Sequence, residues 1–449
     1  MYLFILGRQP EIGLAELRAV FGRVELILPH VALVSTDETP GIDRLGSVRK
    51  VGRVIYDADG QPGEFLIDKF SALPPGKITL GISHYGQSVS IVTASKTAKF
   101  IKSKLHRSMR ILPNSGPEIA DAATLGNHLG SSPNKVELLM AYVGHCLIIA
   151  ELIGVQDLNS YTLRDRGRPK RDAHVGMLPP KLAQIMINLA VGVSSNPGLT
   201  SNRSAKLGND ALKSIDPDRA VWVTRGGAAP KNVLFVEQKF LGADRAAGPK
   251  HPEDEMDFSP SLLDPFCGTG VVLQEAALMG FRVHGTDLEP RMIEYTTANL
   301  DWLKKQNVTK HLSWRAPELA VGDATNFKWV QWLDKVTHEI NLIVTETYLG
   351  QPYTTPPPTE KLQENITTCN TIISKFLINL ATQITPDARL CIAVPCWFLN
   401  DKTYHLPLTH QLSAGSYEQI FYSDDQKPLI YRREDQIVGR ELLVLRKKP

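Results

Sequence analysis

The sequence predicts an α/β protein in which an open, doubly wound sheet follows two smaller α+β units. Three observations lead to this fold class. From Gly176 onward, strand-like apolar runs alternate with helical runs, which is typical of a parallel sheet covered by helices. Residues 1–58 show the strand and helix order of a small βαββαβ unit. The length of 449 residues is too great for one compact core and indicates two to four domains.

The N-terminal unit is predicted from short periodic segments. Apolar residues recur near helical spacing over residues 10–22, and the run ends at a glycine, as helices often do. A Pro-His turn divides residues 24–36 into two short strands. The remaining elements are a strand at residues 2–6, a short helix at 41–48 and a strand at 50–57.

The second predicted unit covers residues 59–160. Residues 77–86 and 89–94 have the apolar character of strands, and residues 95–110 read as a basic helix. The following residues, 161–175, are polar, basic and marked by Pro and Gly, so they are predicted to be a linker.

The third predicted unit covers residues 176–449 and contains an insertion. A helix with Pro at its start is expected at residues 179–192. The stretch from about 191 to 260 is rich in Ser, Asn, Gly, Pro and charge, and we expect a surface insertion of partial order there. Two apolar islands within it, residues 220–225 and 232–240, could pair as a hairpin.

Composition excludes several classes of protein. Hydrophobic content of 43% and charged content of 22% are typical of folded soluble proteins, and a net charge of +3 requires any basic surface to be local. The five scattered cysteines include no C-x-x-C pair, which predicts a reducing, cytoplasmic environment. No run of about 18 apolar residues exists, so no membrane span is expected. The histidines have no ligand spacing, so no metal is expected.

Three acidic strand ends indicate a nucleotide-like ligand. The run Asp-Pro-Phe-Cys-Gly-Thr-Gly from Asp264 to Gly270 follows an apolar strand and precedes a helix, and its glycines let the backbone approach a ligand. A dinucleotide fingerprint is disfavoured because Leu273 replaces its third glycine. Asp287 ends the next strand, where a carboxylate can bind ribose hydroxyls, and Asp323 ends a third.

These residues resemble the S-adenosylmethionine site of class I methyltransferases, which have a Rossmann-like fold. The loop is similar to that of RNA amino-methyltransferases carrying a THUMP domain. The resemblance implies that Asp287 holds ribose, that Asp323 contacts adenine, and that residues from Gly176 to Asn188 help to seat the methionine end. The implied cofactor-binding residues are Asp264, Phe266, Gly268, Thr269, Gly270, Asp287, Leu288, Asp323 and Ala324.

Other segments extend the resemblance to tRNA guanine-N2 methyltransferases that modify guanosine 10. Residues 1–22 resemble their ferredoxin-like domain, residues 100–112 their THUMP helix, and residues 431–445 their closing strands. The resemblance implies tRNA as partner and guanine N2 as target. Basic side chains in the THUMP-like block would contact phosphates without reading sequence. The predicted RNA-binding residues are Lys96, Lys99, Lys102, Lys104, Arg107, Arg110 and, in the linker, Arg168.

The fourth strand of the third unit ends in an unusual loop, Thr-Glu-Thr-Tyr-Leu-Gly from residue 345 to 350. Related enzymes usually carry Asp-Pro-Pro-Tyr-Gly there, a loop that orients the target amine and stacks on the extruded base. The alignment gives Glu346 the acidic role and makes Tyr348 or Tyr353 the stacking aromatic. Three interpretations of the loop stay open: an active variant loop, a methyltransferase with a different target atom, and a protein that binds cofactor or RNA without catalysis. Among enzymes, a DNA amino-methyltransferase is the alternative to an RNA enzyme.

Overall fold

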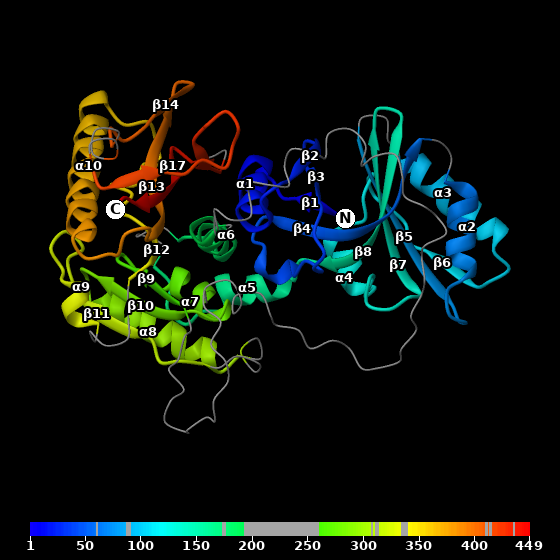
Figure 1. Cartoon of the computed structure of the whole chain (residues 1–449), viewed down its shortest axis with the longest axis horizontal. Coiled ribbons are helices and arrows are strands. Elements are labelled where there is room, and N and C mark those ends of the chain that lie inside the picture. Colours follow the sequence, from blue (N-terminus) through cyan, green and yellow to red (C-terminus); the bar gives the residue numbers. More distant parts are fainter. Residues whose placement is uncertain are drawn as a thin grey trace. The chain divides into compact units, whose positions relative to one another are not determined.

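Strands and helices alternate along most of the chain (Figure 1). The computed structural model describes residues 1–59, 62–86, 91–172, 177–192, 260–306, 309, 314–333, 340–408, 412, 415–433 and 436–449. The predicted insertion with its possible hairpin lies almost wholly outside these residues, as does Gly176. Within the described ranges, every helix is too short or too polar to cross a lipid bilayer.

The N-terminal sheet contains eight strands among the described residues, in the order β2-β3-β1-β4-β8-β7-β5-β6. Their bounds are β1 (Tyr2–Leu6), β2 (Glu25–Leu28), β3 (Val31–Val34), β4 (Val48–Asp59), β5 (Ile78–Tyr85), β6 (Met109–Ile111), β7 (Lys135–Val143) and β8 (Cys146–Val155). The long strand β4 pairs antiparallel with β1 on one side and with β8 on the other. The boundary predicted at residue 58 therefore falls at the end of a strand that joins both units in one sheet.

The helices of this half are α1 (Pro10–Phe21), the 3₁₀ turn η1 (Ile42–Arg44), α2 (Gly63–Ser71), α3 (Ile91–Lys104) and α4 (Asp121–Gly126). Leu66 and Phe70 of α2 and Ile101 of α3 share one apolar cluster with β5 and β7. The strand predicted at residues 89–94 is wrong, because α3 already begins at Ile91. Such a short apolar run fits the first turns of a helix as well as a strand.

The predicted linker begins inside a helix. Helix α5 (Leu158–Arg166) includes the first six of the fifteen residues assigned to the linker. Asp157 caps this helix by accepting hydrogen bonds from the backbone N–H groups of Asn159 and Ser160, both at 3.0 Å. An acidic N-cap is a local signal for the start of a helix, but the polar, basic composition of the segment favoured a linker instead.

The C-terminal sheet contains nine strands among the described residues, ordered β11-β10-β9-β12-β13-β17-β15, with β14 beside β13 and β16 beside β17. Strands β9 to β13 are parallel, and β17 is antiparallel to β13. Their bounds are β9 (Ser261–Asp264), β10 (Arg282–Asp287), β11 (Glu318–Val321), β12 (Leu342–Glu346), β13 (Arg389–Leu399), β14 (Lys402–Tyr404), β15 (Tyr417–Gln419), β16 (Leu429–Tyr431) and β17 (Val438–Lys447).

Helices cover both faces of this sheet. They are α6 (Pro180–Val191), α7 (Val271–Leu278), α8 (Pro290–Lys304), α9 (Trp329–Trp332) and α10 (Thr359–Ala381). Leu342 and Val344 of β12 pack with α6 and α7, whereas Ile343 between them packs with α9 and α10. Successive side chains of a strand point to opposite faces, so β12 is buried on both. The predicted open, doubly wound sheet is confirmed.

Candidate active site

Three carboxylates end three neighbouring strands at the carboxyl edge of the C-terminal sheet. Asp264 ends β9, Asp287 ends β10 and Glu346 ends β12. Strand β9 lies between the other two, and the winding direction reverses between β9 and β12, which is where ligands bind in open α/β sheets. Burial, with the charges of Asp287 and Glu346, raises the pKa of Asp264 to about 8. The geometry thus builds an acidic site at the switch point.

The glycine loop after β9 is shaped by two residues with positive φ. Gly270 has φ of 82°, and a Cβ there would lie 2.8 Å from Thr296 Cγ2. Gly268 has φ of 53°, but the nearest atom to a Cβ at that position is the carbonyl oxygen of Phe266 at 4.0 Å. The backbone therefore needs glycine at both positions, and only Gly268 faces open space that a ligand could fill.

Asp287 joins its own loop to the glycine loop. Its carboxylate accepts hydrogen bonds from the backbone N–H groups of Gly268 at 2.8 Å and Glu289 at 3.0 Å. Burial raises the pKa of Asp287. The next side chain, Leu288, is 63% exposed. The loop after β10 therefore carries a fixed carboxylate beside an exposed apolar side chain.

The loop after β11 lies against the same edge. The backbone N–H of Gly322 donates to the carbonyl of Asp287 at 2.8 Å. Asp323 then accepts a hydrogen bond from the N–H of Thr325 at 2.9 Å, and the buried Ala324 accepts one from Asn379 of α10 at 3.1 Å. The three predicted cofactor loops are thus brought together.

The two remaining cofactor candidates support the glycine loop. The ring of Phe266 packs edge-on against Phe376 of α10, with 5.1 Å between centroids. Thr269 accepts a hydrogen bond from Arg168 Nη1 at 3.2 Å on its hydroxyl and one from Asn299 at 2.8 Å on its carbonyl. Both residues therefore tie the glycine loop to neighbouring elements.

Glu346 has a partner that the sequence did not reveal. Arg440 of β17 donates through Nε to the Glu346 carboxylate. Both side chains are largely buried, with 15% of Glu346 and 8% of Arg440 exposed. Burial raises the pKa of Glu346, and the ion pair with Arg440 partly offsets that rise. The acid at this strand end is therefore held in one position by a fixed cation.

The loop after Glu346 is anchored at both ends. Thr345 donates to Asp264 at 2.6 Å, which ties β12 to the glycine-loop strand. Gly350 has φ of 81° and leaves no room for a side chain beside Asn365. Asn365 accepts from the N–H of Gln351 at 3.1 Å and donates to the hydroxyl of Tyr353 at 3.2 Å. The loop keeps a defined shape without the Pro-Pro pair.

The two tyrosines of this loop differ in their contacts and their exposure to solvent. Tyr353 is half-buried and donates its hydroxyl to the carbonyl of Lys361 at 3.2 Å. Tyr348 is 36% exposed. Tyr353 is thus engaged with α10, whereas the ring of Tyr348 is available at the surface.

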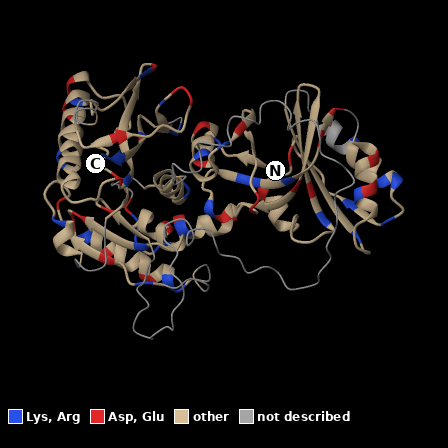
Figure 2. Cartoon of the chain, in the orientation of Figure 1, with Lys and Arg blue, Asp and Glu red and all other residues tan. Residues whose placement is uncertain are grey.

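Figure 2 colours the Lys and Arg positions along the described chain. By burial and contacts, the predicted RNA-binding residues separate into exposed and engaged groups. Arg107 donates to backbone carbonyls of residues 70, 73, 74 and 76 and so closes the turn after α2. Arg168 is 3% exposed and lies against the glycine loop, so the prediction that it contacts RNA at the surface is corrected. The exposed residues are Lys96, Lys99, Lys102, Lys104 and Arg110.

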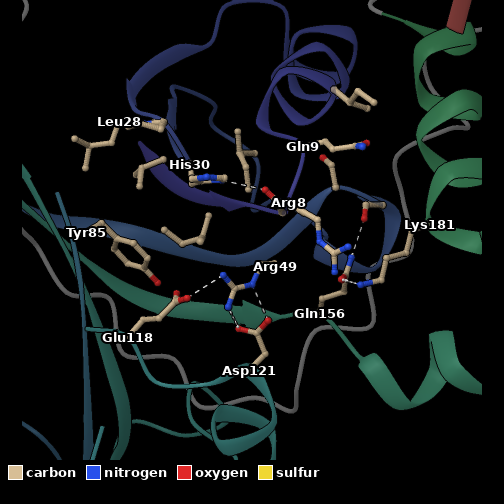
Figure 3. A pocket seen from close by; sticks show the side chains of 18 of the residues that line it. Arg8, Gln9, Leu28, His30, Arg49, Tyr85, Glu118, Asp121, Gln156 and Lys181 are labelled. Carbon is tan, nitrogen blue, oxygen red and sulfur yellow. Dashed lines mark hydrogen bonds and ion pairs between the residues drawn. The ribbon is translucent and has the colours of Figure 1, made fainter. Parts of the chain in front are cut away.

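A pocket of about 1460 Å³ opens beside the N-terminal sheet (Figure 3). Arg49 on its wall is neutralised by Asp121 at 2.8 Å and Glu118 at 3.1 Å. Lys181 donates to Gln156 at 2.5 Å. Arg8 has no carboxylate partner among the described residues. The pocket therefore presents positive charge that other side chains do not fully compensate.

Asn188, which the resemblance placed near the methionine end, is used elsewhere. Its side chain donates to the buried Glu16 of α1 and to the carbonyl of Arg44, both at 2.7 Å. Among the described residues, no three His, Cys, Asp or Glu side chains are grouped as a metal site. Cys267 in the glycine loop is buried, and burial raises its pKa, so packing explains it.

The comparisons with known proteins concern this same region. Residues 255–348, which include the glycine loop and reach Tyr348, match the family described as "RMKL-like, methyltransferase domain". The match covers β9 to β12 and stops before α10. The three acidic strand ends and the glycine loop therefore lie within the stretch that is similar to this methyltransferase-domain family.

Two relatives are similar over part of their length. A tRNA (guanine(10)-N2)-dimethyltransferase of Methanothermobacter thermautotrophicus is 32% identical over 135 residues, which are 30% of this chain and 32% of that protein. A probable tRNA (guanine(10)-N2)-dimethyltransferase of Methanothermococcus thermolithotrophicus is 40% identical over 62 residues, 13% of this chain and 36% of that protein. The chain thus spans about a third of the length of these curated relatives.

Among solved structures, TrmN from Thermus thermophilus aligns with 99% of this chain and 99% of its own length. Its sequence identity is 14% and its TM-score is 0.44.

Proposed function

We propose that this chain transfers a methyl group from S-adenosylmethionine to the exocyclic amine of a base in structured RNA, with guanine N2 in tRNA as the target. The observation that carries the proposal is the meeting of the glycine loop with Asp264, Asp287 and Glu346 at the switch point. The methyltransferase-domain match and the printed activity of the partial relatives support the reaction and the substrate.

The site fits the charge and shape of this cofactor. S-adenosylmethionine carries a sulfonium and an ammonium group, which suit the acidic side chains of Asp264 and Asp287. Asp287 would bind the ribose hydroxyls, Leu288 would cover the adenine ring and Asp323 its amino group. The open space over Gly268 would accommodate the methylene groups that join the sulfonium of the cofactor to its amino and carboxylate groups.

When bound, S-adenosylmethionine supplies an electrophilic methyl group on a good leaving group. The chain's own task is alignment, because the amine lone pair of guanine is delocalised into the ring. Glu346, fixed by Arg440, would accept a hydrogen bond from the amine and direct the lone pair toward the methyl carbon. The new N–C bond forms as the S–C bond breaks, and the nitrogen then loses a proton. Tyr348 would stack on the extruded base.

The RNA half of the proposal rests on exposed cations. The lysines of α3 and Arg110 would contact phosphates, and the pocket beside the N-terminal sheet adds the exposed Arg8 and the half-buried Lys181. A THUMP-like role for residues 59–160 and a cytoplasmic location belong to the same proposal. Neither a metal nor any other cofactor enters it.

The affinity for S-adenosylmethionine should rise with pH. Asp264, with a pKa of about 8, is mostly protonated at neutral pH, and binding a cation beside it must expel that proton. The dissociation constant should therefore fall roughly tenfold between about pH 6.5 and 8. Isothermal titration across this range measures it. In Asp264→Asn, which has no proton to lose there, the dependence should flatten; an equally steep dependence in the variant would assign it to another group.

Replacing the four α3 lysines by glutamine should weaken tRNA binding and make the affinity less dependent on salt concentration. These lysines are Lys96, Lys99, Lys102 and Lys104. The plot of log affinity against log salt should lose roughly 3 to 4 units of slope, about one per phosphate contact. A matched variant replaces four other exposed lysines, Lys304, Lys305, Lys361 and Lys402, and should keep the wild-type slope. Equal slopes for the two variants would remove α3 from the RNA surface.

An assay with methyl-labelled cofactor separates the proposal from its alternatives. Incorporation into tRNA but not into duplex DNA supports the proposal, and the reverse result identifies a DNA amino-methyltransferase. Tight cofactor binding without incorporation into either would make the chain a binding protein.

A further inference from the structure

Arg168 is a buried cation with unfilled hydrogen-bonding capacity. Its side chain is 3% exposed, and Nη1 donates to Thr269 of the glycine loop. Nε and Nη2 are also buried, and they hydrogen-bond to none of the described residues. Buried donors, above all charged ones, rarely stay without an acceptor in folded proteins. An acceptor is therefore expected at this position.

Residues 168–172, here called the docked segment, are fixed to the cofactor side of the domain. Asn299 of α8 accepts from the N–H of Lys170 at 3.0 Å and donates to the carbonyls of Lys170 at 2.9 Å and Thr269 at 2.8 Å. Arg291, also of α8, pairs with Asp172 at 3.1 Å. Besides the hydrogen bond from Nη1 to Thr269, contacts of its neighbours therefore hold Arg168 beside the loop.

The buried carboxylate of α7 does not hydrogen-bond to Arg168. Glu275 of α7 is buried and accepts from Arg164 Nε at 2.8 Å, and that pair involves Oε1. Its other oxygen, Oε2, makes no hydrogen bond. Burial lowers the pKa of the Arg168 guanidinium, whereas the charge of Asp165 opposes that change. Arg168 therefore stays a cation beside a glycine loop that has open space at Gly268.

We propose that Arg168 binds the carboxylate of the methionine part of S-adenosylmethionine. The inference rests on the proposed function and adds to it a residue from outside the methyltransferase-domain match. A guanidinium presents parallel N–H donors in a planar fork that matches a carboxylate. The two free donors of Arg168, Nε and Nη2, supply such a fork, and its remaining nitrogen, Nη1, contacts Thr269, the residue after Gly268. The carboxylate would complete the hydrogen bonding that the protein leaves unfilled.

The test compares two ligands that differ only in that carboxylate. S-adenosylmethionine and its decarboxylated analogue are titrated calorimetrically into the full-length wild type, Arg168→Met and Arg168→Lys. The wild type should bind S-adenosylmethionine about 10- to 100-fold more tightly than the analogue. Arg168→Met should lose that preference by weakening S-adenosylmethionine while leaving the analogue unchanged. Arg168→Lys, a point charge without the fork, should fall between them. Arg171→Met removes an exposed neighbouring charge and should preserve the preference.

Each other outcome has a distinct meaning. Equal affinities of the wild type for the two ligands would overturn the inference. This comparison needs no variant, so the inference can be tested even if Arg168→Met does not fold. Equal losses of both ligands in Arg168→Met would also overturn it, since they would show that Arg168 only supports the loop. A wild type that binds neither ligand would overturn the proposed function itself.

Discussion

Replacing Glu346 by alanine should lower kcat for RNA methylation by about 100- to 1000-fold and leave the affinity for S-adenosylmethionine nearly unchanged. The carboxylate is proposed to act on the target amine, and removing one well-placed polar group from a reaction site typically has an effect of this size. Glu346→Gln keeps an acceptor oxygen and should retain more activity than Glu346→Ala. Single-turnover rates with saturating cofactor and tRNA measure the loss.

The control for this experiment follows from the buried ion pair. Glu346→Ala leaves Arg440 buried without its partner, which can destabilise a protein by about 3–5 kcal/mol. The double variant Glu346→Ala with Arg440→Met removes the unpaired charge and should regain thermal stability without regaining activity. Activity within about tenfold of wild type in Glu346→Ala would exclude the amine-orienting role.

Replacing Asp287 by alanine should weaken S-adenosylmethionine binding by about 100-fold. The change removes the proposed acceptor of the ribose hydroxyls. It also removes the hydrogen bonds that Asp287 accepts from the N–H groups of Gly268 and Glu289, so the loop is held less firmly. Calorimetric titration measures the effect. Asp287→Asn keeps an oxygen and should lose less.

A matched control distinguishes the site from a general charge effect. Asp301 is exposed on α8, so Asp301→Ala removes the same charge without touching the loops and should bind the cofactor as the wild type does. If Asp287→Ala binds S-adenosylmethionine like Asp301→Ala, the cofactor does not meet the end of β10.

Local patterns were sufficient to predict the C-terminal sheet and its loops. The alternation of buried strands and helices gives the doubly wound order, and parallel strands bring their carboxyl ends to one edge. Asp264, Asp287 and Asp323 could therefore be grouped before any coordinates. The glycine loop could be read in the same way, because positive φ at Gly268 and Gly270 demands glycine.

Partners that are distant in sequence could not be predicted. The ion pair of Glu346 and Arg440 joins residues 94 positions apart, and no local signal marks a charged residue in an apolar strand as the partner of one particular acid. The sequence groups Arg107 and Arg168 with the exposed lysines, because composition shows charge and not burial. The sequence also does not predict that β4 joins both N-terminal units in one sheet, since the sequence of a strand does not show which strands it pairs with.

Nucleoside mass spectrometry tests most directly whether the protein transfers a methyl group to a tRNA guanine. Purified chain, S-adenosylmethionine with an isotope-labelled methyl group and unmodified tRNA are incubated, and the tRNA is digested to nucleosides. The proposal predicts labelled N2-methylguanosine with wild type and far less with Glu346→Ala. Labelled methyl on a different nucleoside, or none on any nucleoside while the cofactor binds, would contradict it.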